Sequence, residues 1–329
     1  MILQVSSSPH IRDRSSTPRL MLDVVIALIP ALIASIYMFG YRAALVTAVT
    51  VGSAVLFEYI SRKVMKRYNS ISDYSAVVTG LLLAFNLSPT IPLYIPVIGS
   101  FIAIVIVKQM FGGIGQNFVN PALAARVILT LSYPSAMTRW AILASRAKDA
   151  GAAAVNGAAG GADLISAATP LYLLQDSGGQ VTSDMPTYLH MFIGFKGGCL
   201  GEVPILALLI GIVYLVIRKT IALWTPLAFV GTVGLLTFLG GQDPLYHMLS
   251  GGLVLGAFFM ATDYVTVPLT RSGRVIFGIG CGLITSLIRL FGGMTEGVSF
   301  AILFMNLLTP HIERLTTPVP FGGRAHEKQ

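Results

Sequence analysis

The stretch "DLISAATPL" holds the residues of this sequence best suited to chemistry, namely Asp163, Ser166 and Thr169 among small alanines. Pro170 follows directly and keeps the Thr169 hydroxyl from being absorbed into a helix. Three uses of these hydroxyls are open. Hydrolysis by a serine nucleophile requires a GxSxG turn or a nearby base, and neither is evident. The second possibility is a surface loop of small residues that takes part in no chemistry. The third is that Thr169 carries a covalent group, since its small neighbours would give a modifying enzyme access to the hydroxyl.

The composition of the chain identifies its surroundings. Among 329 residues, 54% are hydrophobic and 11% are charged, whereas an average soluble domain carries about 25% charged residues. A membrane-spanning helix needs about 20 apolar residues, and lipid admits only helices and closed barrels. The apolar runs are continuous rather than alternating, so we predict helices. The expected spans are 20–39, 43–60, 75–88, 92–110, 121–133, 199–217, 221–239, 245–262, 274–291 and 297–312, of which the third and fifth are too short to cross alone.

Short similarities between the two halves of the chain indicate an internal repeat. "TGLLLAF" at 79–85 is similar to "GGLVLGAFF" at 251–259, and "MFGGIGQ" at 110–116 is similar to "LFGGMTE" at 290–296. Chance similarity between glycine-rich helices is the alternative. Each half holds five predicted spans, and an odd number inverts the second half; inverted repeats form sites from broken helices. We therefore predict an all-α polytopic membrane protein of two inverted five-helix repeats with discontinuous helices.

The basic residues predict the orientation. Of the 22 lysines and arginines, 15 fall in loops on the side of the termini and 6 on the other side, and Arg126 lies within a span. The positive-inside rule places both termini in the cytoplasm. The net charge of +8 then needs no nucleic acid as partner, and the polar N-terminal stretch predicts no cleavable signal peptide. The predicted parts are a cytoplasmic arm (1–19), a first repeat (20–133), an extracytoplasmic loop (134–198), a second repeat (199–313) and a cytoplasmic tail (314–329).

Isolated polar residues in or beside the spans are further candidates. Arg126 is costly in lipid and needs a carboxylate, a backbone end or a phosphate as its partner. Asp243 and Asp263 lie at span ends, where they form part of a cation path or serve as capping carboxylates. The two cysteines, Cys199 and Cys281, lack metal-binding spacing, so we expect no metal site and no iron–sulfur cluster held by this chain alone.

A glycine- and amide-rich break separates the fourth and fifth predicted spans. It contains Gly112, Gly113, Asn117 and Asn120. Its backbone groups can cradle a polar ring or a cation. Alternatively, it is a tight turn that needs glycine for positive φ. The sequence leaves both interpretations open.

The sequence around Thr169 resembles the flavinylation motif of a membrane-protein family. That family comprises the RnfD protein of the Rnf-type ion-translocating oxidoreductase and the NqrB protein of the Na⁺-translocating NADH:quinone reductase. Its motif is an Asp, two variable residues, and Ser/Thr-Gly-Ala-Thr/Ser, whose last residue carries FMN as a phosphoester installed by a flavin transferase from FAD. Asp163, Ser166, Ala168 and Thr169 match the motif. Ala167 departs from the usual glycine and leaves the acceptor hydroxyl in place.

Longer stretches extend this resemblance over nearly the whole chain. They are "SDYSAVVTGLLLAFNLSP" (72–89), "KQMFGGIGQNFVNPALAARV" (108–127) and "DPLYHMLSGGLVLGAFFMATDYVTVP" (243–268). The length and the short N-terminal arm are closer to the RnfD branch of the family. The resemblance implies an electron-transfer subunit of an ion-translocating ferredoxin:NAD⁺ oxidoreductase in a bacterial inner membrane, with FMN on Thr169 and no catalytic residue of its own. The soluble NAD and ferredoxin chemistry would belong to other subunits.

The resemblance also implies cofactors and partners beyond that site. A second, non-covalent flavin such as riboflavin is expected, without a position. The expected partners are the RnfA, RnfB, RnfC, RnfE and RnfG proteins of the Rnf complex, the flavin transferase, membrane lipid, and Na⁺ or H⁺. Two other classes of function remain open: a channel or carrier for a small polar solute without flavin, and a scaffold whose loop is never modified. The carboxylates at span ends suit either ion.

Overall fold

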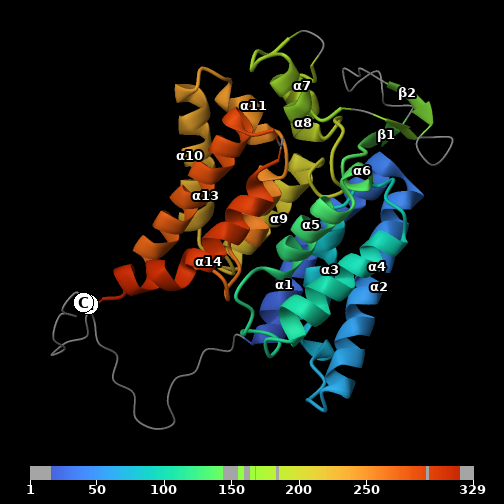
Figure 1. Cartoon of the computed structure of the whole chain (residues 1–329), viewed down its shortest axis with the longest axis vertical. Coiled ribbons are helices and arrows are strands. Elements are labelled where there is room, and N and C mark those ends of the chain that lie inside the picture. Colours follow the sequence, from blue (N-terminus) through green and yellow to red (C-terminus); the bar gives the residue numbers. More distant parts are fainter. Residues whose placement is uncertain are drawn as a thin grey trace.

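The computed structural model describes residues 16–143, 155–158, 164–166, 168–182, 185–293 and 296–318. Helices dominate this part of the chain, as predicted, and they pack into one bundle (Figure 1). Asp163 and Ala167 lie outside the described residues. The fold matters here for the way its helix ends position polar side chains.

The first half of the chain forms long and short helices in alternation. Its elements are α1 (Thr17–Phe39), α2 (Tyr41–Val64), the 3-10 turn η1 (Ile71–Asp73), α3 (Ser75–Phe85), α4 (Tyr94–Phe101), the π-helical η2 (Ile102–Gln109), α5 (Pro121–Ser132) and the single turn α6 (Pro134–Met137). Gly40 separates α1 from α2 at a φ of 74°, which a glycine adopts without steric cost. Asn120 begins α5, because its side-chain oxygen accepts hydrogen bonds from the N–H groups of Ala122 and Leu123.

The segment between the two halves contains short elements of both kinds. They are β1 (Ala141–Leu143), β2 (Val155–Ala158), β3 (Leu164–Ser166), α7 (Pro170–Asp176) and α8 (Tyr188–Ile193). The strands form an antiparallel sheet in the order β1-β3-β2. The sequence did not predict these strands, because they are too short to show a period of two.

The second half again consists of helices. Its elements are α9 (Ile205–Ile217), α10 (Trp224–Leu239), α11 (Pro244–Leu249), α12 (Leu253–Leu255), the π-helical η4 (Gly256–Met260), α13 (Arg271–Phe291) and α14 (Val298–Thr316). A π-helical stretch therefore occurs in each half, directly before a break. Such stretches are frequent at functional sites.

Every one of the ten predicted ranges contains a helix. Among the described residues, three helices are long and apolar enough to cross a membrane, namely α1, α2 and α13. The third and fifth ranges hold the short helices α3 and α5, of 11 and 12 residues, in agreement with the prediction of discontinuous helices. The chain is thus a membrane protein with several apolar helices.

Glycines allow the closest contacts between helices. A methyl group at Gly211 of α9 would lie 2.0 Å from the Ala27 carbonyl oxygen of α1. A methyl group at Gly278 of α13 would lie 2.5 Å from the Thr225 carbonyl oxygen of α10. Small residues at such crossings let backbones approach and are typical of packing between membrane helices.

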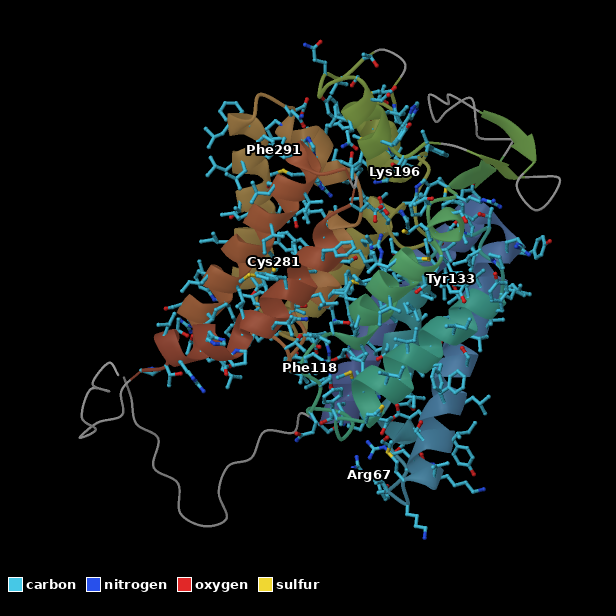
Figure 2. All side chains as sticks on the ribbon, in the orientation of Figure 1. Arg67, Phe118, Tyr133, Lys196, Cys281 and Phe291 are labelled. Carbon is cyan, nitrogen blue, oxygen red and sulfur yellow. The ribbon has the colours of Figure 1, made fainter. Side chains whose placement is uncertain are left out.

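The two FGG motifs lie in opposite halves of the bundle. Figure 2 places Arg67 at one end, called here the Arg67 end, and Lys196 toward the other, called the Lys196 end. Phe291, in the second motif, lies toward the Lys196 end (Figure 2). Phe111, in the first motif, contacts Phe118 with 4.7 Å between ring centroids, and Phe118 lies nearer the Arg67 end (Figure 2).

Replacing Gly211 by alanine tests the α1–α9 contact. The added methyl group meets a backbone oxygen that cannot rotate away, so we expect destabilisation of roughly 1–3 kcal/mol and a lower unfolding temperature. Gly231→Ala in α10 is the matched control, because nothing lies within 4 Å of its Cβ position. The unfolding temperatures of the two variants are compared by heating the detergent-purified proteins and measuring the fraction that stays monodisperse. Equal unfolding temperatures would contradict the close contact.

Candidate functional site

Thr169 is the residue that caps α7. Its backbone is extended (φ −75°, ψ 151°), and its Oγ1 accepts a hydrogen bond from the Tyr172 N–H at 3.2 Å. Pro170 is the first helical residue, so the hydroxyl stays outside the helix as predicted. Thr169 is buried. Ser166 ends β3, which brings the motif from a strand into a helix start.

A basic cavity lies against α7. It measures about 190 Å³ and is lined by Leu171, Leu174, Gln175, Gly178, Gly179, Gln242, His247, Arg289 and Leu290. Arg289 of α13 donates to the carbonyl oxygens of His247 at 2.7 Å and Ser250 at 3.2 Å. Its Nε has no hydrogen-bond partner among the described residues. The cavity therefore places a buried cation near the helix that Thr169 begins.

The partner of Arg126 is a carboxylate, which is one of the three kinds of partner that the sequence left open. It pairs through Nη2 with Glu296, which precedes α14, and donates through Nη1 to the Asn86 side-chain oxygen at 2.5 Å. Asn86 follows the last residue of α3. Arg126 is 7% exposed. The pair thus joins α3 and α5 of the first half to the second half.

Further polar groups gather around this pair. Lys196 is 1% exposed and donates to the Leu249 carbonyl oxygen at 2.6 Å. Ligand atoms of Cys199, Glu202 and Glu296 lie within 4.8 Å of one another, close enough for a metal ion. Arg126 already donates to the Cys199 sulfur and to Glu296, so a guanidinium occupies the position of a cation. We interpret the cluster as an ion-pair network rather than a metal site.

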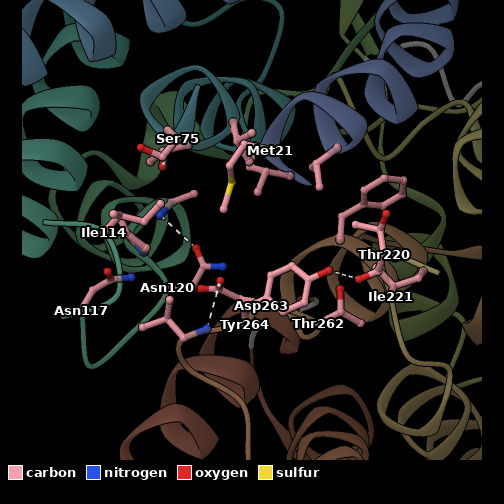
Figure 3. Close-up of a pocket in the computed structure, with 18 of the residues that line it drawn as sticks. Met21, Ser75, Ile114, Asn117, Asn120, Thr220, Ile221, Thr262, Asp263 and Tyr264 are labelled. Atoms are coloured by element: carbon pink, nitrogen blue, oxygen red, sulfur yellow. Dashed lines mark hydrogen bonds between the residues drawn. The ribbon is translucent and has the colours of Figure 1, made fainter. Parts of the chain in front are cut away.

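A second cavity lies between the two halves (Figure 3). It measures about 90 Å³, and its walls include Met21, Val24, Leu82, Phe258 and Phe259, with the polar groups Ser75, Lys108, Asn117, Asn120, Thr262 and Asp263. Asn120 donates to the Met260 carbonyl oxygen at 3.4 Å. Asp263 accepts hydrogen bonds from the Thr266 hydroxyl at 3.3 Å and the Val265 N–H at 3.5 Å. The amides of one half and the carboxylate of the other thus share one cavity.

The glycines of the break have a different role from its asparagines. Gly112 and Gly113 have φ values of 127° and 105°, which favour glycine. A methyl group at Gly113 would lie 2.1 Å from the Arg62 guanidinium. Neither glycine lines the cavity, whereas Asn117 and Asn120 do. The glycines form the tight turn, and the amides line the cavity.

The two aspartates singled out from the sequence are separated in the structure. Asp243 caps α11 by accepting from the Tyr246 N–H at 3.0 Å, and the Tyr188 hydroxyl donates to it. Burial raises the pKa of Asp243, but these hydrogen bonds outweigh it and hold the pKa below the usual value. Asp243 is a capping carboxylate, and Asp263 is the one of the two that lines the cavity between the halves.

A second buried ion pair was not predicted from the sequence. Lys108 of η2 and Glu58 of α2 lie 2.8 Å apart, with side chains that are 3% and 0% exposed. Both sit near ends of predicted spans, where interfacial charges are ordinary. The same reason explains why four further buried polar residues were not predicted, namely Glu202, Lys196, Arg289 and Asn86. The sequence signal that could have identified them is a charged or amide residue directly beside a long apolar run.

The helices, the buried charges and the glycine crossings define a polytopic membrane protein with polar sites inside its bundle. The sequence matches the "NQR2, RnfD, RnfE family" over residues 4–322, and the chain belongs to this family. It is 48% identical to the D component of the Na⁺-translocating ferredoxin:NAD⁺ oxidoreductase complex of Acetobacterium woodii, over 99% of this chain and 98% of that protein.

Two further relatives carry similar names. The D component of the proton-translocating ferredoxin:NAD⁺ oxidoreductase complex of Clostridium ljungdahlii is 43% identical over 98% of this chain and 97% of its own. The D component of the ion-translocating oxidoreductase complex of Escherichia coli (strain K12) is 36% identical over 98% of this chain and 99% of its own. The resemblance drawn from the sequence is confirmed at the level of the family and extends over the whole chain.

Breaking the Arg126–Glu296 pair tests the network. Arg126→Met leaves a carboxylate without its cation in the bundle, and loss of one partner of a buried pair costs roughly 3–5 kcal/mol. We expect this variant to unfold at a lower temperature. The double variant Arg126→Met, Glu296→Gln removes both charges and recovers part of the loss. A double variant as unstable as the sum of the two single variants would show that the charges do not interact.

Proposed function

We propose that this chain is the electron-carrying membrane subunit of an ion-translocating ferredoxin:NAD⁺ oxidoreductase complex, with FMN attached to Thr169. The names of its full-length relatives support the complex. The single observation that carries the flavin site is the position of Thr169, whose hydroxyl lies outside α7 in a segment that matches the flavinylation motif. Its partners are then the other subunits of that complex and a flavin transferase.

The residues around Thr169 fit a phosphoester. The described contacts of the hydroxyl leave its own proton without an acceptor, since Oγ1 only accepts from the Tyr172 N–H. That N–H is equally able to face a phosphoryl oxygen. Arg289 lies beneath α7 with an unpartnered Nε and offsets negative charge there. The bound isoalloxazine supplies the redox chemistry, and the protein holds and tunes it.

We further propose the cavity between the halves as the place of the second, non-covalent flavin. Apolar walls from Leu82 and Phe259 suit a flat ring system, and the amides of Asn117 and Asn120 offer donors and acceptors to its polar edge. Phe118, which follows the cavity residue Asn117, lies nearer the Arg67 end than the Lys196 end (Figure 2), whereas α7 lies at the opposite end (Figure 1). The two flavins would lie toward opposite sides of the membrane.

The proposed architecture is two inverted five-helix repeats, with the Arg67 end in the cytoplasm. Positions 180 residues apart make similar contacts, which supports the repeat. Arg126 donates to Asn86 at the end of α3. Asn306, in the amide orientation that satisfies its neighbours, donates to the Thr266 carbonyl oxygen at 3.3 Å. The pairs α1 with α9 and α5 with α14 are also in contact, as is expected of corresponding helices next to a pseudo-two-fold axis.

The ion remains either Na⁺ or H⁺ in this proposal. The relatives from Acetobacterium woodii and Clostridium ljungdahlii carry different ions in their names at comparable identity. Ion selectivity depends on a few ligand groups rather than on the overall sequence. Asp263 is the carboxylate of this chain that is best placed to contact a cation in the cavity.

Thr169→Ala is expected to abolish covalent flavin. The chain without a substitution, coexpressed with its flavin transferase, should give a fluorescent band on a denaturing gel. Its intact mass should be raised by the mass of FMN less one water. Thr169→Ser should keep part of the signal. Thr187→Ala is the matched control, since Thr187 caps α8 in the same segment. A fluorescent Thr169→Ala band would refute the site. A band without fluorescence from the chain that has no substitution would favour a function as a channel or scaffold.

Asn117→Leu is expected to lower the amount of non-covalent flavin by about tenfold or more. The substitution keeps the approximate size of the side chain and removes its hydrogen-bonding groups, and a buried polar contact to a ligand is worth roughly 1–3 kcal/mol. The measurement is flavin released by acid from the purified protein, compared with the covalent band on the gel. Asn69→Leu, at an exposed loop residue, is the control. Unchanged release would contradict the cavity assignment.

A further inference from the structure

The Glu58–Lys108 ion pair joins α2 to η2 inside the bundle. Its two charges are buried, with 2.8 Å between Lys108 Nζ and Glu58 Oε2. A buried pair is weak support for stability, because desolvation offsets the attraction and an apolar pair of similar volume is often as stable. Ionisable groups inside membrane proteins commonly mark ion or proton pathways. The pair therefore calls for a function.

Hydrogen bonds connect Lys108 to the loop that precedes α3. Its Nζ donates to the Ser75 hydroxyl at 2.6 Å, and Ser75 donates to Asp73, which is half-buried in that loop. On the other side, Glu58 accepts from the hydroxyl of Ser70 at 2.6 Å, and Ser70 is also half-buried. Two short hydrogen-bonded branches thus lead from one buried ammonium group toward the loop at 65–74.

The same ammonium group faces the cavity between the halves. Lys108 and Ser75 both line it, and Figure 3 shows Ser75 on one wall and Asp263 among the residues of another. Asp263 is the charged group contributed by the second half, and Arg62 of α2 approaches the turn at Gly113 nearby. Lys108 is therefore the junction between the loop and whatever the cavity holds.

We propose that Lys108 delivers protons from the Arg67 end of the bundle to a redox group in the cavity. The proposal rests on the proposed cavity flavin. Full reduction of an isoalloxazine takes two electrons, supplied by the NADH or ferredoxin of the complex, and two protons. With a flavin in the cavity, each transfer would break an Nζ–H bond of Lys108 and pass its proton to a ring nitrogen, and the electron pair of that bond would stay on Nζ, which becomes an amine.

The amine then recovers its proton through the hydrogen-bonded branch. Ser75 gives its hydroxyl proton to Nζ and takes one from Asp73, which exchanges protons with solvent. Glu58 pairs with the resting ammonium group of Lys108. Proton transfer by a positioned side chain typically contributes about 10²–10⁴-fold to a rate. Lys108 thereby acts on the occupant of the cavity, and Ser75 and Glu58 are positioning residues.

The test uses the full chain with Thr169→Ala, so that no covalent flavin absorbs, loaded with riboflavin. Binding is followed by quenching of riboflavin fluorescence, and reduction by dithionite is followed by stopped-flow absorbance in H₂O and D₂O. Lys108→Arg retains the positive charge and the pairing with Glu58, but a guanidinium does not release its proton. We expect riboflavin affinity within about threefold of the parent, reduction about 100-fold slower, and a changed solvent isotope effect.

A second series avoids any change at the ion pair. Ser75→Ala should slow reduction and Ser75→Thr should restore it. Ser100→Ala is the matched control, because Ser100 is a buried serine that donates to the Thr50 carbonyl oxygen outside the cavity. Riboflavin binding with parent rates in both Lys108→Arg and Ser75→Ala would overturn the proton path alone. Absence of riboflavin binding in the parent chain would overturn the cavity flavin, and the proton path with it.

Discussion

A charge buried in an apolar bundle needs a partner, and the other features of this protein depend on how that need is met. The Arg126 guanidinium is held by the carboxylate of Glu296 and the amide of Asn86. These groups come from three separate segments, so one interaction fixes the end of α3, the position of α5 and the approach to α14. Removing any one of them leaves polar atoms that lipid cannot satisfy.

The polar interior is divided between the two ends of the bundle. Toward the Lys196 end, Arg289 lines the cavity against the helix that Thr169 begins, and Lys196 is buried. Between the halves, nearer the Arg67 end, amides and one carboxylate surround a largely apolar cavity. In the proposed function, this division gives an anionic cofactor and an uncharged one different electrostatic surroundings within one short chain.

Composition and run length were sufficient to predict the helices, because lipid leaves few alternatives to a continuous apolar run. They also predicted that Arg126 needs a partner. They did not identify Glu296 as that partner, since its approach depends on breaks whose path no local pattern encodes. Glu58 and Lys108 were placed at span ends, where charges are ordinary; only the packing of α2 against η2 brings them together. The strands β1 to β3 escaped prediction because pairing, not propensity, stabilises them. The Thr169 site came from resemblance to a family motif, which spacing and periodicity do not supply.

On the proposed repeat, related positions have acquired different chemistry. Arg126 corresponds to Asn306, and Gln109 corresponds to Arg289, each 180 residues apart. The first repeat therefore contributes its arginine to the central network, and the second contributes its arginine to the cavity below α7. A symmetric pair of charges would place the same potential at both ends. Exchanging arginine for an amide in opposite repeats instead leaves both arginines out of the lining of the cavity between the halves, so that a symmetric scaffold can hold two different occupants.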